Sequence, residues 1–463
     1  MNKKGKTAGI KGFAAMLVTA CLAAMLCLFA GCTIMPAPDE NQVALVGKTY
    51  YEDLGEAIAA AKSGETITLF KDVDLSDTLV VENKKIKLDL NGNTVYNTED
   101  IWCVKNEDSW SLVSVREGGE LTITGNGKML AKENDCYTID IVDGGKLVID
   151  NGTFVGNITA VYAYNGTAEI KGGKYSLLQD MSYQDTVNPN KYLLNCYDES
   201  FAAGTASITV SGGTFDKFNP ARSFEKDRVS FLADGYKTVM NEDGTYAVAK
   251  LAEEDAVTVN GMAYKTLTEA VSAATDGDMV KLLTDVNLSD TLVIENKKLT
   301  LDLNGKTIYN TEDIWGVKNK NSWSLISVRG TADVTITGNG KMLAKENDIY
   351  AFDVYDETAK LTIESGEFNG NISAVYVYAG TLTVKGGTFN IQQKNGGNNP
   401  YAFLLNCLDA NYKNGTAKIT VYGGTFYGSD PSSSTGENPV ANFLADGYKS
   451  VANEDGTYTV VAE

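Results

Sequence analysis

The chain has 463 residues, with 40 Lys and Arg residues against 60 Asp and Glu residues, which gives a formal net charge of −20. This acidic balance excludes a nucleic-acid binder, because no basic stripe is available to contact phosphates. The chain contains no histidine, which excludes Ser-His-Asp and Cys-His catalysis and most transition-metal sites. Hydrophobic residues make up 43% of the chain and recur at regular intervals, so we expect a folded protein.

The segment 1–31 is expected to direct export and to lie outside the fold. A lysine-rich start precedes an apolar stretch over residues 13–30, an order typical of a secretory signal. Its end, LFAGC at 28–32, resembles the lipobox of bacterial lipoproteins, which implies that Cys32 is the lipid attachment residue. We therefore expect an exported lipoprotein of the bacterial cell membrane that faces the outside, with 32–42 as a tether. A plain signal peptide or a retained membrane helix is the alternative.

Two copies of one unit follow the tether, copy one at residues 43–250 and copy two at residues 251–463. The segment TLVVENKKIKLDLNGNTVYNTED from Thr78 recurs as TLVIENKKLTLDLNGKTIYNTED from Thr291. Repetition is typical of solenoids and arrays, which usually supply a surface and not a unique active site. We expect the two copies to form two tandem domains.

Each copy is expected to open with a short amphipathic helix. Leucine, isoleucine, valine and alanine fall at the spacing of one helical face over residues 54–61 and again over residues 267–274. Gly64 and Gly277 follow these segments, and glycine is suited to the left-handed position at a helix C-terminus. The amphipathic face predicts that each helix plugs the open end of the strands that follow.

The rest of each copy is expected to consist of short strands. After a first strand at residues 66–69 or 279–282, the apolar period is two, as in IKLDL at residues 86–90, whose aliphatic residues share one face. The segments 121–123 and 147–149 repeat this pattern. The strands end in Asn or Gly, which tolerate positive φ and turn the chain sharply.

A motif of strand, Gly, any residue and an aromatic residue recurs inside each copy. Its aromatic residues are expected to stack inside the core: Phe154, Tyr175, Phe215, Phe368, Phe389 and Phe426. The first two of each set are 21 residues apart (154 to 175 and 368 to 389), which is typical of one coil of a parallel β-helix. Hairpins would place turns every 8–12 residues or so. A pair of antiparallel β-sandwiches is the rival fold.

Three segments resemble repeat units of exported surface proteins of gut-dwelling Gram-positive bacteria. They are LxEAxxxAxxGDxxxLLxDV over 267–286, LDLNGxT over 301–307 and NEDGTYxV over 453–460. The resemblance covers nearly all of the chain after the tether and implies a pectin-lyase-like fold with a display or adhesion role. The predicted fold class is therefore all-β, a right-handed parallel β-helix solenoid in two tandem copies, each headed by a short capping α-helix.

Four cysteines remain after the lipid attachment residue. Cys196 and Cys407 are equivalent in the two copies and are expected to be buried thiols on strands. Cys103 and Cys136 occur in copy one alone, and their joint presence fits either a disulfide or two free thiols. No CxxC pair is present in the sequence, which argues against zinc.

The four tryptophans all belong to one duplicated loop with acidic neighbours. The candidate ligand-binding residues are therefore Trp102, Trp110 and Asp100 in copy one and Trp315, Trp323 and Asp313 in copy two. Flat aromatic rings beside polar groups suit a glycan, because sugar C–H faces stack on rings while hydroxyls form hydrogen bonds. The alternative interpretation is that the tryptophans fold over the first coils and seal the core.

Enzymes that share the implied fold include polysaccharide lyases, which place an Arg or Lys base beside calcium ligands. Arg116 and Arg329 are equivalent in the two copies, and alternation predicts that Val115 and Val328 point inward while the arginines point outward as partners of carboxylates. No catalytic residue is therefore assigned. No cofactor or metal is predicted, with calcium as the alternative because of the many carboxylates.

The leading functional hypothesis is a cell-surface module that binds glycans or adheres to a host surface without catalysis. Its expected partners are the membrane, through the lipid anchor, and a glycan or host-surface ligand, with nucleic acid excluded. One alternative is an extracellular polysaccharide lyase or glycosidase, which needs two suitably spaced carboxyl groups. A second alternative is a structural spacer in the cell envelope.

Overall fold

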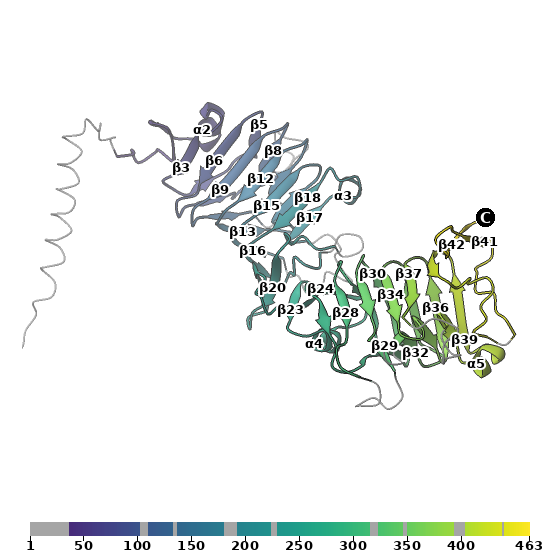
Figure 1. Cartoon of the computed structure of the whole chain (residues 1–463). Coiled ribbons are helices and arrows are strands. Elements are labelled where there is room, and N and C mark those ends of the chain that lie inside the picture. The colour runs from purple at the N-terminus through teal and green to yellow at the C-terminus, as the bar shows by residue number, and fades with distance from the viewer. Residues whose placement is uncertain are drawn as a thin grey trace, which may run out of the picture. The chain divides into compact units, whose positions relative to one another are not determined.

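The computed structural model describes residues 37–101, 110–132, 137–179, 192–223, 229–314, 323–345, 350–392, 403–437 and 439–463. These residues form a mostly β protein with parallel-strand sheets and a few short helices (Figure 1). Their contacts define two compact units. The first comprises the chain as far as Ala168 with Leu177–Asp180 and Ser200–Ser207, and the second comprises the remainder. The predicted export segment, Cys32, Cys103 and Cys136 lie outside the described residues.

The predicted helix at the start of each copy is confirmed as α2 (Leu54–Ala60) and α4 (Leu267–Ala273). Asp53 accepts a hydrogen bond from the backbone N–H of the third helical residue of α2. Thr266 does the same for α4 within a full capping box. Each helix therefore begins where a polar side chain satisfies an otherwise unpaired N–H group.

The C-terminal ends of these helices differ from the prediction. Gly64 and Gly277 do have positive φ values of 93° and 84°, but they lie in the turn before the next strand, and Ala61 and Ala274 are the extended C-cap residues. The terminal carbonyl oxygens of α4 instead accept hydrogen bonds from Lys297 Nζ, at 2.7, 2.7 and 2.8 Å. Copy one has the equivalent arrangement around Lys84. A lysine ammonium at a helix C-terminus also complements the helix dipole.

In the first unit, consecutive strands join three parallel ladders in rotation. Ladder A contains β3 (Thr66–Leu69), β6 (Lys85–Asp89), β9 (Glu120–Thr124) and β12 (Lys146–Ile149). Ladder B contains β4 (Val73–Asp74), β7 (Thr94–Tyr96), β10 (Lys128–Leu130) and β13 (Thr153–Gly156). Ladder C contains β5 (Leu79–Glu82), β8 (Ser111–Arg116), β11 (Tyr137–Ile141) and β14 (Val161–Ala163).

The second unit repeats the three ladders. Ladder A contains β24 (Asp278–Leu282), β27 (Lys298–Asp302), β30 (Asp333–Thr337), β33 (Lys360–Ile363), β36 (Gly380–Val384) and β39 (Ala417–Val421). Ladder B contains β25 (Val286–Asn287), β28 (Thr307–Tyr309), β31 (Lys341–Leu343), β34 (Glu367–Gly370), β37 (Thr388–Ile391) and β40 (Gly424–Tyr427). Ladder C contains β26 (Leu292–Glu295), β29 (Ser324–Arg329), β32 (Tyr350–Val354), β35 (Val375–Val377) and β38 (Leu405–Cys407). The parallel ladders show that the rival interpretation, a pair of antiparallel sandwiches, is wrong.

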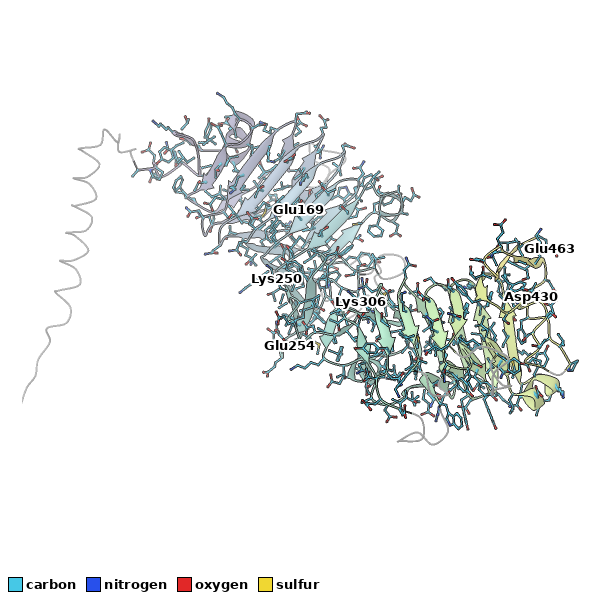
Figure 2. All side chains as sticks on the ribbon, in the orientation of Figure 1. Glu169, Lys250, Glu254, Lys306, Asp430 and Glu463 are labelled. Atoms are coloured by element: carbon cyan, nitrogen blue, oxygen red, sulfur yellow. The ribbon has the colours of Figure 1, made fainter. Side chains whose placement is uncertain are left out.

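The other elements include strands that extend the ladders, namely β15 to β19, and strands at the ends of the sheets. The strands are β1 (Ala44–Val46), β2 (Thr49–Tyr51), β15 (Thr167–Ile170), β16 (Lys174–Leu177), β17 (Leu194–Cys196), β18 (Ser207–Val210), β19 (Thr214–Asp216), β20 (Tyr236–Met240), β21 (Thr245–Lys250), β22 (Val257–Val259), β23 (Met262–Tyr264), β41 (Tyr448–Ala452) and β42 (Thr457–Ala462). The short helices α3 (Asp198–Ala202) and α5 (Asp409–Asn414) complete the set. Charged side chains such as Lys250 and Glu254 are exposed to solvent (Figure 2).

The predicted stacking of core aromatic rings is confirmed for five of the six residues, and the sixth, Phe154, is buried as predicted. Phe389 lies between Phe368, at 5.3 Å between ring centroids, and Phe426, at 5.0 Å. Tyr175 and Phe215 stack at 4.8 Å in the same way. All five rings are buried, as are the predicted thiols of Cys196 and Cys407. The strand spacing thus places equivalent side chains of successive strands in direct contact.

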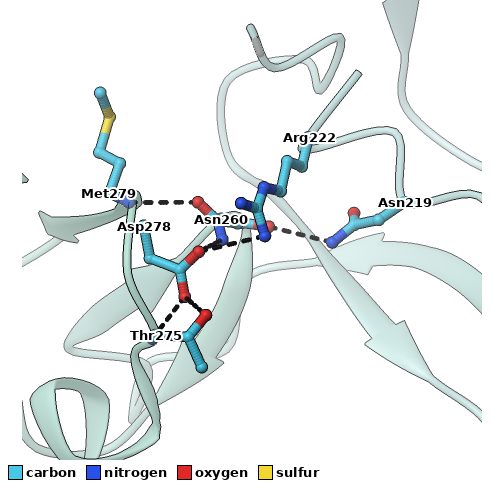
Figure 3. Close-up of polar contacts among 6 residues, drawn as sticks. All are labelled: Asn219, Arg222, Asn260, Thr275, Asp278 and Met279. Atoms are coloured by element: carbon cyan, nitrogen blue, oxygen red, sulfur yellow. Dashed lines mark hydrogen bonds and ion pairs between the residues drawn. The ribbon is translucent and has the colours of Figure 1, made fainter. Parts of the chain in front are cut away.

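The end of copy one and the start of copy two meet inside the second unit, at a polar joint (Figure 3). The Asp278 carboxylate accepts a hydrogen bond from Asn260 at 2.8 Å and forms an ion pair with Arg222 at 3.1 Å. Thr275 donates to the other oxygen through its backbone N–H at 2.7 Å. Burial raises the pKa of Asp278, but these hydrogen bonds and the Arg222 charge outweigh burial and leave the pKa below its ordinary value.

Candidate functional site

Two of the predicted ligand-binding tryptophans lie at the surface and line cavities. Trp110 is 40% exposed and Trp323 is 43% exposed, so neither ring seals the core. Trp110 belongs to a cavity of about 450 Å³ in the first unit, and Trp323 belongs to a cavity of about 210 Å³ in the second unit. Trp102 and Trp315 lie outside the described residues.

The two predicted acidic residues are not among the residues that line these cavities. Asp100 forms an ion pair with Lys132 at 2.7 Å, and Asp313 forms the equivalent pair with Lys345 at 2.6 Å. The hydrogen bond to the carboxylate raises the pKa of each lysine. These exposed pairs are typical of surface salt bridges and contribute little to stability.

The first cavity is a groove on the outer face of ladder C, and we name it groove one. Its lining residues are Trp110, Arg116, Tyr137, Asp140, Val142, Asp143, Tyr162 and Tyr164. Asp140 pairs in register with Ser114 on one side and Tyr162 on the other. Because successive side chains of a strand point to opposite faces, the buried Ile139 and Ile141 place Asp140 on the outer face.

The second cavity, groove two, occupies the equivalent position on ladder C of the second unit. Its lining residues are Trp323, Tyr350, Asp353, Tyr355, Tyr376 and Tyr378. Ser327, Asp353, Tyr376 and Asn406 follow one another along neighbouring strands in register. The two grooves therefore share a tryptophan, three tyrosines and a carboxylate at matching positions.

A buried carboxylate forms the floor of each groove. Asp140 and Asp353 are both 3% exposed although they lie on the outer face of the ladder. Asp353 accepts a hydrogen bond from Ser324 Oγ at 2.7 Å and another from Ser327 Oγ. The carboxylate is the acceptor in both contacts, which fix its position on the floor of the groove.

The tyrosines form the walls and are arranged as stacked or tilted rings. Tyr350 stacks on Tyr376 at 5.1 Å, and Tyr355 stacks on Tyr378 at 4.9 Å. Burial raises the pKa of Tyr376, so its hydroxyl stays protonated and remains a hydrogen-bond donor. The grooves thus combine flat apolar faces with hydroxyl donors and a carboxylate acceptor, a combination that can contact both the C–H faces and the hydroxyls of a sugar.

A second buried carboxylate, Glu437, lies close enough to Tyr376 of groove two for its charge to help raise the pKa of that tyrosine. Its Oε1 accepts a hydrogen bond from the backbone N–H of Cys407 at 2.6 Å, and Cys407 belongs to β38 beside the strand of Tyr376. Glu437 is 3% exposed, and burial raises its pKa to about 7. By sequence, the equivalent residue of copy one is Glu225, which lies outside the described residues.

The predicted outward position of the two arginines is confirmed, since Val115 and Val328 are buried and the arginines are partly exposed. Arg116 donates to Ser114 Oγ at 2.9 Å, and Arg329 donates to Ser327 Oγ at 2.8 Å. Both contacts are to hydroxyls that border the floor of a groove. The arginines therefore help to position the floor.

Neither a metal centre nor a membrane span emerges from the described part of the chain. Within it, no group of three or more His, Cys, Asp or Glu side chains is arranged to hold a metal ion. No helix in the same residues is long and apolar enough to cross a membrane.

No family model matches this chain, and neither the curated proteins nor the solved structures contain a match.

Sequence reasoning identified Trp110 and Trp323 but missed the tyrosines and the floor carboxylates. A signal was present, because YTIDI from Tyr137 and YAFDV from Tyr350 place an aromatic residue and an aspartate at matching positions of a strand. In the sequence alone, each segment is typical of an ordinary strand. The register of ladder C places the first beside Tyr162 and the second beside Tyr376.

Proposed function

We propose that this chain is an exported surface lipoprotein whose two grooves bind glycans without catalysis. The observation that supports this most is the recurrence, in both copies, of a tryptophan and tyrosines around a buried outer-face aspartate. Sugar C–H faces stack on such rings, while sugar hydroxyls donate to the carboxylate and accept from tyrosine hydroxyls. An adhesive role at the cell surface follows if the glycan belongs to a host or to a neighbouring cell.

For the scaffold, we propose that the three ladders of each unit wind as a right-handed parallel β-helix of the pectin-lyase-like kind. The rotation of consecutive strands over three parallel ladders supports this arrangement. In it, α2 and α4 cap the first coil of each copy and protect strand edges that would otherwise invite aggregation. Copy one and copy two are then tandem domains, which present the grooves on a rigid outer wall.

For the location, we propose that Cys32 is acylated and holds the protein at the outer side of the bacterial cell membrane. The LFAGC segment at residues 28–32 supports this assignment. Several acyl chains hold a protein firmly, since each buried methylene contributes about 0.8 kcal/mol. Loss of radiolabelled palmitate and release from the membrane fraction are the expected results for Cys32→Ala. Unchanged labelling of this variant would refute the assignment.

The binding proposal is tested on an array of neutral and acidic glycans with the full chain purified in detergent. The double variant Trp110→Ala with Trp323→Ala is expected to lose the signals seen for the wild type while keeping its urea midpoint. Tyr427→Ala is the matched control, because Tyr427 is 47% exposed on β40 and lies outside both grooves. No bound glycan for a folded wild type would refute the proposal and favour a structural spacer of the envelope.

A glycosidase is the second candidate, because groove one contains two carboxylates, Asp140 and Asp143. Glycoside hydrolysis generally needs an acid and a base or nucleophile on either side of the bond. Release of reducing sugar from a bound glycan, lost in Asp140→Asn, would replace the binding proposal with this one. Binding without release would exclude it for that glycan.

A further inference from the structure

The two grooves differ at one wall position, where groove one has Val142 and groove two has Tyr355. Both residues follow the strand that carries the floor aspartate, two positions after Asp140 and two after Asp353. Among the described residues that line either groove, this is the position at which the residue type differs between the copies, although Arg116 and Asp143 also line groove one while their equivalents do not line groove two. The change replaces a small aliphatic group with a large aromatic ring.

Tyr355 forms part of the wall of groove two. Its ring stacks on Tyr378 at 4.9 Å with an interplanar angle of 9°, and the Arg329 guanidinium lies 4.8 Å from the centre of the same ring. These contacts hold Tyr355 as a fixed wall. In groove one, by contrast, Arg116 itself lines the cavity, and Tyr164 meets Tyr162 edge to face at 6.3 Å.

The cavity volumes differ in the direction expected for this substitution. Groove one has a volume of about 450 Å³, and groove two has a volume of about 210 Å³. Small-molecule sites generally span about 300–1,000 Å³, so groove one has room for a ligand and groove two falls below that range. The residues that the two grooves share make both chemically suitable for a sugar, but the grooves differ in volume.

We propose that the residue at position 142 or 355 sets the size of the bound glycan, so that groove one holds an oligosaccharide and groove two is closed to it by Tyr355. The inference rests on the proposed glycan binding and adds its specificity. Groove one is then the primary site of the chain. Groove two accommodates at most a single small sugar unit.

The test exchanges the two residues in the full chain and titrates each variant with neutral β-linked glucose oligomers, from mono- to hexasaccharide, by isothermal titration calorimetry. The wild type is expected to bind the longer oligomers at one site per chain. Tyr355→Val is expected to raise the stoichiometry to two sites. Val142→Tyr is expected to weaken binding of the longer oligomers by roughly tenfold or more, which corresponds to about 1.4 kcal/mol.

Matched controls use exposed residues outside the grooves. Val440 is 57% exposed and Tyr427 is 47% exposed, so Val440→Tyr and Tyr427→Val report the effect of the same side-chain changes elsewhere. Circular dichroism and urea midpoints verify that each variant folds. Wild-type binding at two equal sites, or a stoichiometry unmoved by Tyr355→Val, would overturn the inference while leaving glycan binding intact. If the wild type binds none of the oligomers, both proposals fail for this class of sugar.

Discussion

The buried carboxylate of Glu437 allows a stability prediction whose sign and size follow from the structure. Burial raises its pKa from the ordinary value of 4.5 to about 7 in the folded protein. Between pH 4.5 and about pH 7, the folded state therefore keeps a proton that the unfolded state has lost. Stability from this proton is fully present below pH 4.5, declines as the pH rises towards 7, and is gone above the folded-state pKa.

The size of the effect is the pKa difference multiplied by the free energy of one pKa unit. A difference of about 2.5 units, at 1.36 kcal/mol for each unit, gives about 3 kcal/mol. The charged form is disfavoured chiefly by burial and further by the negative charge of Asp409, while the hydrogen bond from the Cys407 N–H acts in the opposite direction. The carboxylate therefore destabilises copy two at alkaline pH.

Glu437→Gln removes the ionisation and keeps an amide oxygen for the Cys407 N–H. The variant is expected to be about 3 kcal/mol more stable than the wild type at pH 8 and about equal to it at pH 4. Urea unfolding of the full chain at pH 4, 6 and 8 measures this difference. Glu357→Gln is the control, because Glu357 is an exposed residue whose neutralisation is expected to change little. A Glu437→Gln variant that is no more stable at pH 8 than the wild type would refute the reasoning.

Three further predictions concern the scaffold, each measured by the free energy of unfolding in urea. Phe389→Ala removes a fully buried ring between two stacked neighbours and is expected to cost about 3–5 kcal/mol; a loss below about 1 kcal/mol would contradict the stacked core. Lys297→Met leaves terminal carbonyls of α4 without their ammonium donor and is expected to cost about 1–2 kcal/mol, whereas Lys298→Met, at an exposed lysine, is expected to be neutral. Asp278→Asn removes the charge that pairs with Arg222 and is expected to lower the free energy of unfolding by about 1–3 kcal/mol at pH 7. Because the folded pKa of Asp278 is depressed, its contribution is lost as the pH falls through that pKa, so a difference that persists at pH 2 would argue against the ion pair.

The elements of this fold could be predicted from the sequence because their signals are local. The aliphatic spacing over residues 54–61 and 267–274 fixes one face of a helix, and the period of two fixes one face of each strand. The stack of Phe368, Phe389 and Phe426 was predictable for a related reason, since equal spacing along the chain becomes direct contact between parallel strands. Helix ends were not predictable, because the donor to the last turn of α4 is Lys297, 23 residues or more from the carbonyls.

The grooves were only partly predictable, because their residues meet through the register of ladder C. Asp353 and Tyr376 lie on different strands and become neighbours through the pairing of β32 with β35. Tryptophan is rare in this chain, so Trp110 and Trp323 stood out by composition alone. Asp100 stood out for its proximity to tryptophan in the sequence, yet its carboxylate pairs with Lys132 outside the groove.

The three ladders offer an internal comparison for the functional argument, because they are made by the same strands in rotation. On ladder A the outer-face residues stay in contact with water, as in β6, where Lys85 and Lys87 are exposed. On ladder C the outer-face residues Ser114 and Asp140 are buried, and Asp140 lines groove one together with a tryptophan and three tyrosines. Burying a polar group costs about 1–3 kcal/mol unless it is hydrogen-bonded, and on ladder C the row is bonded: Arg116 donates to Ser114, and Ser324 and Ser327 donate to Asp353. A buried polar row with aromatic walls, present on one ladder in both copies, is the feature on which the proposed glycan binding rests.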